Sequence, residues 1–152
     1  MISAQASILI ERPVASVFAF VARDFFENYP RWSPELELLE VLSPGPIRLG
    51  SAARQVRVDH GRRTDTTFKV VEWEPLRHVA FAELDQRYHL RYSFEPAGNT
   101  VAGPDAAPHT RLIFACRLKR LSLPLRPFKS LIRDAVQEGA ERTVVAIKRL
   151  VE

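Results

Sequence analysis

The sequence predicts an α+β fold in which a long carboxy-terminal helix lies across an antiparallel β-sheet. Three observations support this prediction. Apolar residues in the last 28 positions recur at steps of three and four, as on one face of a helix. Most of the preceding chain alternates between apolar and polar residues, as in strands, and the connections between these segments are mostly short and rich in turn residues. Short connections favour antiparallel neighbours, and an apolar helical face needs a sheet to cover it.

The first part of the chain predicts one strand followed by two short helices. Alternation over Ser3–Ile10 indicates the strand. A helix is expected from Pro13 to about Ala22, because proline is favoured in the first helical turn and apolar residues follow at helical spacing. A second helix is expected over Phe25–Tyr29. It should end there, because Pro30 and Pro34 restrict the residues before them.

Six further strands are expected before the last helix. Their ranges are Leu36–Leu42, Ser51–Asp59, Arg62–Trp73, Arg77–Leu84, Arg87–Glu95 and Thr110–Leu121. One connection, Ala97 to His109, is long and rich in Ala, Gly and Pro. It is interpreted as a hairpin tip, with a lid over an opening as the alternative.

The last helix is expected over Leu125–Glu152, with a wide apolar stripe. Its members are Phe128, Leu131, Ile132, Ala135, Val136, Gly139, Thr143, Ala146, Ile147 and Leu150. Gly139 costs about 1 kcal/mol relative to alanine in mid-helix, and several neighbours on the stripe are small. Small residues either let the helix pack tightly on the sheet or leave space below it, and both outcomes remain open.

Alternation along the strands predicts which side chains face this helix. Over residues 88–94, Tyr88, Leu90, Tyr92 and Phe94 share one face. The same rule groups Leu112 with Phe114, Cys116 and Leu118, and groups Thr66 with Phe68 and Val70. The inner face should therefore carry several large aromatic side chains, two of which have hydroxyl groups that need partners when buried.

Composition predicts one domain, residues 1–152, in the cytoplasm. No apolar run approaches the ~20 residues of a membrane span, and no secretory signal pattern is found at the start. The single cysteine, Cys116, fits a reducing compartment and a buried thiol. A net charge of +4 raises nucleic-acid binding as a question. The basic residues are scattered, and we expect no nucleic-acid partner. Arg54, Arg57, Arg62 and Arg63 are interpreted as a solvated sheet face.

A denser basic group surrounds the start of the last helix. It comprises Arg117, Lys119, Arg120, Arg126, Lys129 and Arg133. Such a group can attract an anionic headgroup or surface, so transient contact with an anionic membrane is a possible interaction. The protein is expected to be a monomer or a homodimer.

This order of elements resembles the helix-grip fold of START and Bet v 1-like (SRPBCC) proteins, particularly the bacterial polyketide cyclase/dehydrase and lipid-transport branch. The resemblance covers nearly the whole chain. It is carried by residues 10–14 (IERPV), 17–21 (VFAFV), 26–34 (FENYPRWSP), 70–75 (VVEWEP), 77–81 (RHVAF) and 92–96 (YSFEP). It implies a sheet curved around the last helix, with an apolar cavity between them that opens near the short helices and hairpin tips. The 97–109 connection is longer than the tight turn expected there.

The resemblance also implies a lipid, polyketide, sterol-like or quinone-like ligand. By position, the lining candidates are Phe18, Trp32, Phe68, Phe81, Tyr88, Tyr92, Phe94, Phe114, Leu131, Ala135 and Gly139. Binding or transport of such a ligand is the leading hypothesis. The alternative is a polyketide cyclase, aromatase or dehydratase in the same cavity.

Signals for catalysis are weak. The histidines lack zinc-site spacing, and neither a nucleophile elbow nor a phosphate or dinucleotide motif is found, so no metal and no cofactor are expected. Catalytic residues are left unassigned. The conceivable groups for polarising a ketone or moving a proton are Tyr88, Tyr92, Thr66 and Arg54. The alternative is that all four have structural roles: the tyrosines in the core, the threonine as an ordinary strand residue and the arginine as a charge at the rim.

Overall fold

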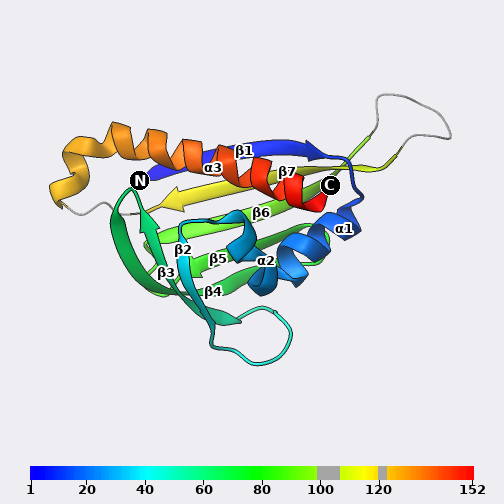
Figure 1. The fold of residues 1–152 in the computed structure, drawn as a ribbon, viewed down its shortest axis with the longest axis horizontal. Helices are drawn as coiled ribbons and strands as arrows, with labels where there is room; N and C mark the ends of the chain where they lie inside the picture. The colour runs from blue at the N-terminus through cyan, green and yellow to red at the C-terminus, as the bar shows by residue number, and fades with distance from the viewer. Residues whose placement is uncertain (99–106, 120–122) are drawn as a thin grey trace.

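The computed structural model describes residues 1–98, 107–119 and 123–152. The described residues form an antiparallel sheet of seven strands in the order β1-β7-β6-β5-β4-β3-β2 (Figure 1). The strands are β1 (Ile2–Ile10), β2 (Leu36–Val41), β3 (Ala52–Asp59), β4 (Arg62–Glu74), β5 (His78–Glu83), β6 (Tyr88–Ala97) and β7 (His109–Leu118). Turns of two to four residues connect β3, β4, β5 and β6 in chain order, and a longer loop, residues 42–51, connects β2 to β3. β7 returns between β6 and β1. The predicted strands and their antiparallel pairing are confirmed, except that the predicted end of the last strand, residues 120–121, lies outside the described residues.

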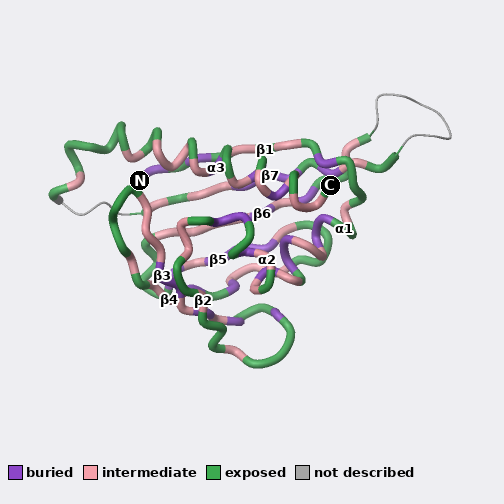
Figure 2. The backbone as a smooth tube through the Cα atoms, viewed as in Figure 1, coloured by how far each residue is buried: buried purple, intermediate pink, exposed green. Residues whose placement is uncertain are grey.

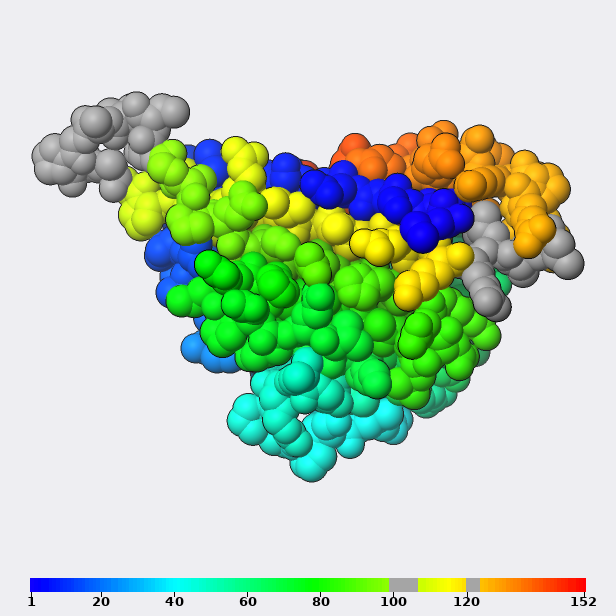
Figure 3. Space-filling view, turned by 180° about the vertical axis from the view of Figure 1, so that it is seen from behind, coloured from blue at the N-terminus to red at the C-terminus, as the bar shows by residue number. Residues whose placement is uncertain are grey.

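The helices lie on one side of the sheet (Figure 1). They are α1 (Val14–Phe18), the π-helical turn η1 (Ala19–Arg23), α2 (Phe25–Trp32), the 3₁₀ helix η2 (Leu123–Phe128) and α3 (Lys129–Val151). α3 packs along β1 and β7, and α1 contacts β6 and β7. Figure 3 shows the opposite face, on which the strands lie side by side. No described helix is both long enough and apolar enough to cross a membrane.

Two predicted helix boundaries are wrong. α2 continues through Pro30 to Trp32, and its last turn is closed by Ser33 N–H donating to the Tyr29 carbonyl at 3.2 Å. Pro30 removes only its own donor, so it does not end the helix. The α-helix at the carboxy end begins at Lys129 rather than Leu125, because residues up to Phe128 form the tighter η2, which contains Pro127.

The buried stripe of α3 is also rotated from the predicted one. Its fully buried residues are Ala140, Val144 and Ile147, whereas Gly139, Thr143 and Ala146 are only half-buried. Figure 2 shows that burial is concentrated in the carboxy-terminal half of the helix and that its first turns are largely exposed. The helix therefore grips the β1–β7 end of the sheet through its second half.

The predicted inner face of the sheet is confirmed. Phe68, Tyr92, Phe94 and Phe114 are buried in one apolar cluster with residues of α1, α2 and α3. The outer face carries charged pairs such as Arg91 with Glu72, at 2.6 Å. Most of the 97–109 connection, residues 99–106, lies outside the described residues, so the interpretation of that segment as a tip or a lid stays a prediction.

Candidate functional site

Three aromatic side chains of α2 fill the space over the inner face of the sheet. Phe25, Tyr29 and Trp32 follow one another at four and three residues, which places them on one helical face, and all three are buried. Phe25 lies at the centre of the cluster. Its ring stacks on Phe81 with centroids 4.2 Å apart and on Tyr29 at 4.8 Å. α2 is thus attached to the sheet mainly by aromatic contact.

The structure divides the predicted lining residues into three groups. Around Phe25 it brings together Trp32, Phe68, Phe81, Tyr88, Tyr92 and Phe114. Phe18 and Phe94 pack on each other, with centroids 5.2 Å apart, and Phe18 also contacts Trp73. On α3, Ala135 and Gly139 are half-buried, and Leu131 is 67% exposed.

The interior is largely filled by its own side chains. The space enclosed between α2 and the sheet measures only about 10 Å³. It is lined by Phe25, Tyr29, Gln55, Phe68, Phe81, Tyr88 and Leu90. A ligand-sized volume there therefore requires the α2 aromatics to move outward.

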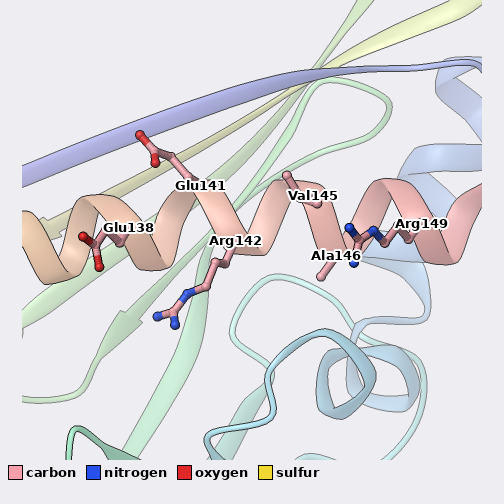
Figure 4. Close-up of a pocket in the computed structure, with 6 residues that line it drawn as sticks. All are labelled: Glu138, Glu141, Arg142, Val145, Ala146 and Arg149. Atoms are coloured by element: carbon pink, nitrogen blue, oxygen red, sulfur yellow. The ribbon is translucent and has the colours of Figure 1, made fainter.

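A larger hollow, of about 560 Å³, lies on α3 alone (Figure 4). Its lining consists of Glu138, Glu141, Arg142, Val145, Ala146 and Arg149, with no described residue from the sheet. Because one helix surface provides every wall, this hollow is open to solvent. The more enclosed candidate site is the aromatic interior.

A chain of hydrogen bonds runs along one side of this interior. Arg57 of β3 donates through one nitrogen to the Tyr29 hydroxyl at 2.6 Å and to the Ser33 hydroxyl at 2.7 Å. Its other nitrogens bind the Asp59 carboxylate at 3.1 and 3.2 Å. Arg57 therefore ties β3 to α2, and its charge is compensated by Asp59. Paired in this way, a partly buried guanidinium is tolerated.

The chain continues from Tyr29 through Gln55 to Tyr88. Tyr29 donates to the Gln55 side-chain carbonyl at 2.7 Å, and the Gln55 amide nitrogen donates to the Tyr88 hydroxyl at 2.9 Å. These lengths are usual for O–H···O and N–H···O bonds respectively, which supports this orientation of the amide. Tyr88 accepts in this chain, and Thr66 is a second hydrogen-bond partner of its hydroxyl group.

Burial holds these groups in their protonated forms. It raises the pKa of Tyr88 to about 12 and that of the Cys116 thiol to about 11. The pKa of Tyr29 is also raised, mainly by burial and against the opposing effect of Arg57. Burial raises the pKa of Tyr92 as well. At neutral pH the phenols are therefore hydrogen-bond donors rather than bases.

The four residues considered for catalysis lie on different faces. Tyr88, Tyr92 and Thr66 are on the inner face, and Thr66 is the strand partner of Gln55. Arg54 lies opposite Thr67 on the exposed side of the hairpin, and it binds the carboxylate of the diagonal neighbour Asp65 at 2.7 and 2.9 Å. Arg54 is thus a surface ion-pair residue.

Several residues of the interior are absent from the sequence-predicted candidates. The prediction of a solvated face for both Arg54 and Arg57 is wrong for Arg57, because the two are three positions apart and a regular strand turns them to opposite faces. Alternation would have found it, since Ala53, Gln55 and Arg57 share a face. Helical spacing would likewise have added Phe25 and Tyr29 to Trp32.

The described residues contain no group of three or more His, Cys, Asp or Glu side chains placed to hold a metal ion. The polar groups of the interior are phenols, an amide, hydroxyls and a compensated guanidinium. This arrangement can orient a largely apolar molecule that carries a hydrogen-bond acceptor.

A long carboxy-terminal helix gripped by an antiparallel sheet, with aromatic residues between them, defines the helix-grip class of START and Bet v 1-like proteins. The chain belongs to the family described as polyketide cyclase / dehydrase and lipid transport, which matches residues 1–152. A comparison with curated protein sequences finds no match.

Several solved structures share the fold. The protein TTHA0849 from Thermus thermophilus superposes with a TM-score of 0.77 at 19% identity, covering 98% of this chain and 96% of that one. The Zhui aromatase/cyclase from Streptomyces sp. R1128 gives a TM-score of 0.70 at 15% identity, over 98% and 92%. A START superfamily protein from Mycobacterium smegmatis gives 0.66 at 16%, over 99% and 97%. At these identities the likeness shows the fold alone.

Proposed function

We propose that this protein binds or carries a hydrophobic small molecule in the aromatic interior between α2, α3 and the sheet. The observation that carries the proposal is the polar chain along that interior. Arg57, Tyr29 and Gln55 are hydrogen-bonded in sequence, and the chain ends on the hydroxyl group of Tyr88, which lines the remaining space of the interior. A site that orients an apolar molecule through one oxygen atom needs this arrangement.

Affinity would come mainly from the apolar area that the ligand buries, at ~25 cal/mol per Å². Tyr88 would add direction by donating to a carbonyl or hydroxyl oxygen, polarised through the chain by the charge of Arg57. The family description supports a lipid or a polyketide as the ligand, and a quinone-like molecule is the third class that we propose. Because the enclosed space is small, binding would be coupled to an outward shift of Phe25 and its neighbours on α2.

A polyketide cyclase, aromatase or dehydratase is the second candidate. The position of the Tyr88 hydroxyl group at the end of the chain favours it, since polarising a ketone is the first requirement of such a reaction. The fold shared with the Zhui aromatase/cyclase is compatible with this candidate. A cyclase would need, in addition, a group that removes a proton from the bound substrate.

Native mass spectrometry of the protein purified from its own host tests the binding function. A retained lipophilic molecule is the expected result, and its mass would identify the ligand class. The Tyr88→Phe and Tyr92→Phe variants separate the two candidates. For a carrier, each should hold the ligand within about tenfold of the wild-type affinity, because one hydrogen bond contributes ~1 kcal/mol. Complete loss of a measurable turnover in either variant would favour the enzyme.

We further propose that residues 1–152 act as one domain, in the cytoplasm, as a monomer or homodimer. Transient contact with an anionic membrane would let a carrier collect or release its ligand. Exposed residues support this contact: Arg126, Lys129 and Arg133 surround Phe128 and Leu131, which are 52% and 67% exposed.

A further inference from the structure

One carboxylate faces the interior, and the hydrogen-bonded chain does not include it. Glu83 ends β5, where alternation places it on the same face as Val79 and Phe81. It is only 5% exposed, and its strand partner on β4 is the buried Phe68. A carboxylate in such a position is unusual, because burying an ionised group is costly unless a partner compensates it.

Glu83 lies beside Tyr88, the last residue of the hydrogen-bonded chain. Ala82 of β5 pairs with His89 of β6, so the next position on each strand brings Glu83 and Tyr88 together on the inner face. Directly opposed residues of this kind have Cβ atoms about 5 Å apart. Glu83 also contributes to raising the pKa of Tyr88, as a nearby negative charge does.

No described cation fully compensates Glu83. Its only ion-pair partner among the described residues is Arg87, at 3.9 Å, which is 66% exposed and also lies 3.6 Å from Asp85. Arg57, the other charged group of the interior, is already engaged by Asp59 at 3.1 Å and approached by Glu35 at 3.8 Å. The described charges therefore leave this end of the interior negative. Burial is the main reason that the pKa of Glu83 is raised, with Asp85 adding to it and Arg87 opposing it.

We propose that Glu83 and Tyr88 together select a neutral, hydroxyl-bearing apolar ligand, such as a phenol, an enol or an alcohol, and exclude carboxylates. Tyr88 donates its hydrogen to the ligand oxygen, and Glu83 accepts the hydrogen of that same hydroxyl group. A fatty acid or another carboxylate would place a second negative charge beside Glu83, with no free cation of the described residues to balance it. This inference rests on the proposed binding function and adds the chemical class of the ligand.

Three probes of one shape test it: naphthalene, 2-naphthol and 2-naphthoate, titrated calorimetrically at pH 7.5. The wild-type protein should bind 2-naphthol at least tenfold more tightly than 2-naphthoate. Glu83→Gln should reduce that preference at least fivefold, mainly because 2-naphthoate binds more tightly. Asp85→Asn removes an exposed carboxylate two residues away and is the matched control, so its effect on the preference should be much smaller than that of Glu83→Gln. Glu83→Ser serves as the second variant if Glu83→Gln does not fold.

The outcomes distinguish this inference from the proposed function. Equal or tighter binding of 2-naphthoate to the wild type would overturn the selectivity, as would an unchanged preference in both Glu83 variants. If Asp85→Asn changes the preference as much as Glu83→Gln does, any negative charge near this site gives the selectivity, and the specific role of Glu83 is contradicted. If none of the three probes binds, the proposed function itself is contradicted, and the inference fails with it.

Discussion

At the scale of single residues, the interior holds two charged side chains that differ in compensation. Arg57 is surrounded by acceptors, with Tyr29, Ser33 and Asp59 within 2.6 to 3.2 Å. Among the described residues, Glu83 has as its cationic partner only the exposed guanidinium of Arg87, 3.9 Å away, and the backbone N–H of Arg87 also supports its carboxylate. A compensated buried charge fixes the position of its neighbours, whereas an uncompensated one lowers stability. We therefore expect Arg57 to stabilise the fold and Glu83 to act in ligand binding.

The uncompensated charge predicts that Glu83→Gln stabilises the protein at neutral pH. A carboxyl group whose pKa is raised on folding costs stability above its unfolded pKa, because the folded state holds the charged form less readily. The variant should gain roughly 1 kcal/mol at pH 7. Below about pH 4, where the carboxyl group is protonated in both states, the gain should disappear.

Urea unfolding of both proteins at pH 7 and pH 3.5 measures this difference. Asp85→Asn is again the control, since Asp85 is exposed and should change stability little. A variant that is less stable than the wild type at pH 7 would mean that the contact with Arg87 outweighs the cost of burial.

At the scale of elements, α2 decides how much room the interior offers. Its three buried aromatics occupy the space over β4, β5 and β6, and Arg57 holds the helix there through Tyr29 and Ser33. Within α2, Phe25 touches the most aromatic neighbours, whereas the adjacent Phe26 is only partly buried. The two phenylalanines therefore provide a matched pair.

Phe25→Ala should both destabilise the protein and open the interior. Loss of a buried phenylalanine costs about 3–5 kcal/mol, and the cavity left behind would adjoin Tyr88. Binding of naphthalene should therefore become tighter. Phe26→Ala should cost less stability and leave binding unchanged. Thermal unfolding and calorimetric titration of the two variants measure both effects. If neither variant binds naphthalene more tightly than the wild type, ligands do not occupy the space of the Phe25 side chain.

Much of this architecture could be predicted from the sequence because alternation is a strong signal. The inner-face residues Tyr88, Tyr92 and Phe114 followed from it directly. The end of α2 could not be predicted in this way. Pro30 lacks a hydrogen-bond donor, but the packing of Trp32 outweighs the loss of that one hydrogen bond, so the helix continues. The rotation of the α3 stripe also escaped prediction, since apolar residues surround much of that helix and contact with β1 selects among them. Ion pairs such as that of Arg57 with Asp59 depend on side-chain geometry, which the spacing of residues in the sequence does not give.

At the scale of the whole molecule, α3 is attached to the sheet from Gln137 onward, where the Gln137 side chain is hydrogen-bonded to the Gln5 backbone of β1. Its second half packs on the sheet through the buried residues Ala140, Val144 and Ile147. At its end, the Arg12 side chain donates to the Glu152 backbone carbonyl at 3.0 Å. The first turns are exposed. Over positions 123–135 the sequence contains three basic residues and a single acidic residue, Asp134. An exposed helical segment of this composition is suited to an anionic surface, to which the apolar side chains add contact area.

Vesicle sedimentation tests this contact with the whole protein. Vesicles with phosphatidylglycerol should retain the protein, whereas phosphatidylcholine alone should not, and salt should weaken retention because exposed charges are screened. Phe128→Ser with Leu131→Ser should reduce retention several-fold. Leu49→Ser with Leu84→Ser removes two leucines that are 62% and 55% exposed elsewhere, and should change nothing. Equal loss in both double variants would show that general hydrophobicity holds the protein on the vesicle. Retention independent of lipid charge would contradict the role of the basic residues, and the carrier would then have to meet its ligand in solution.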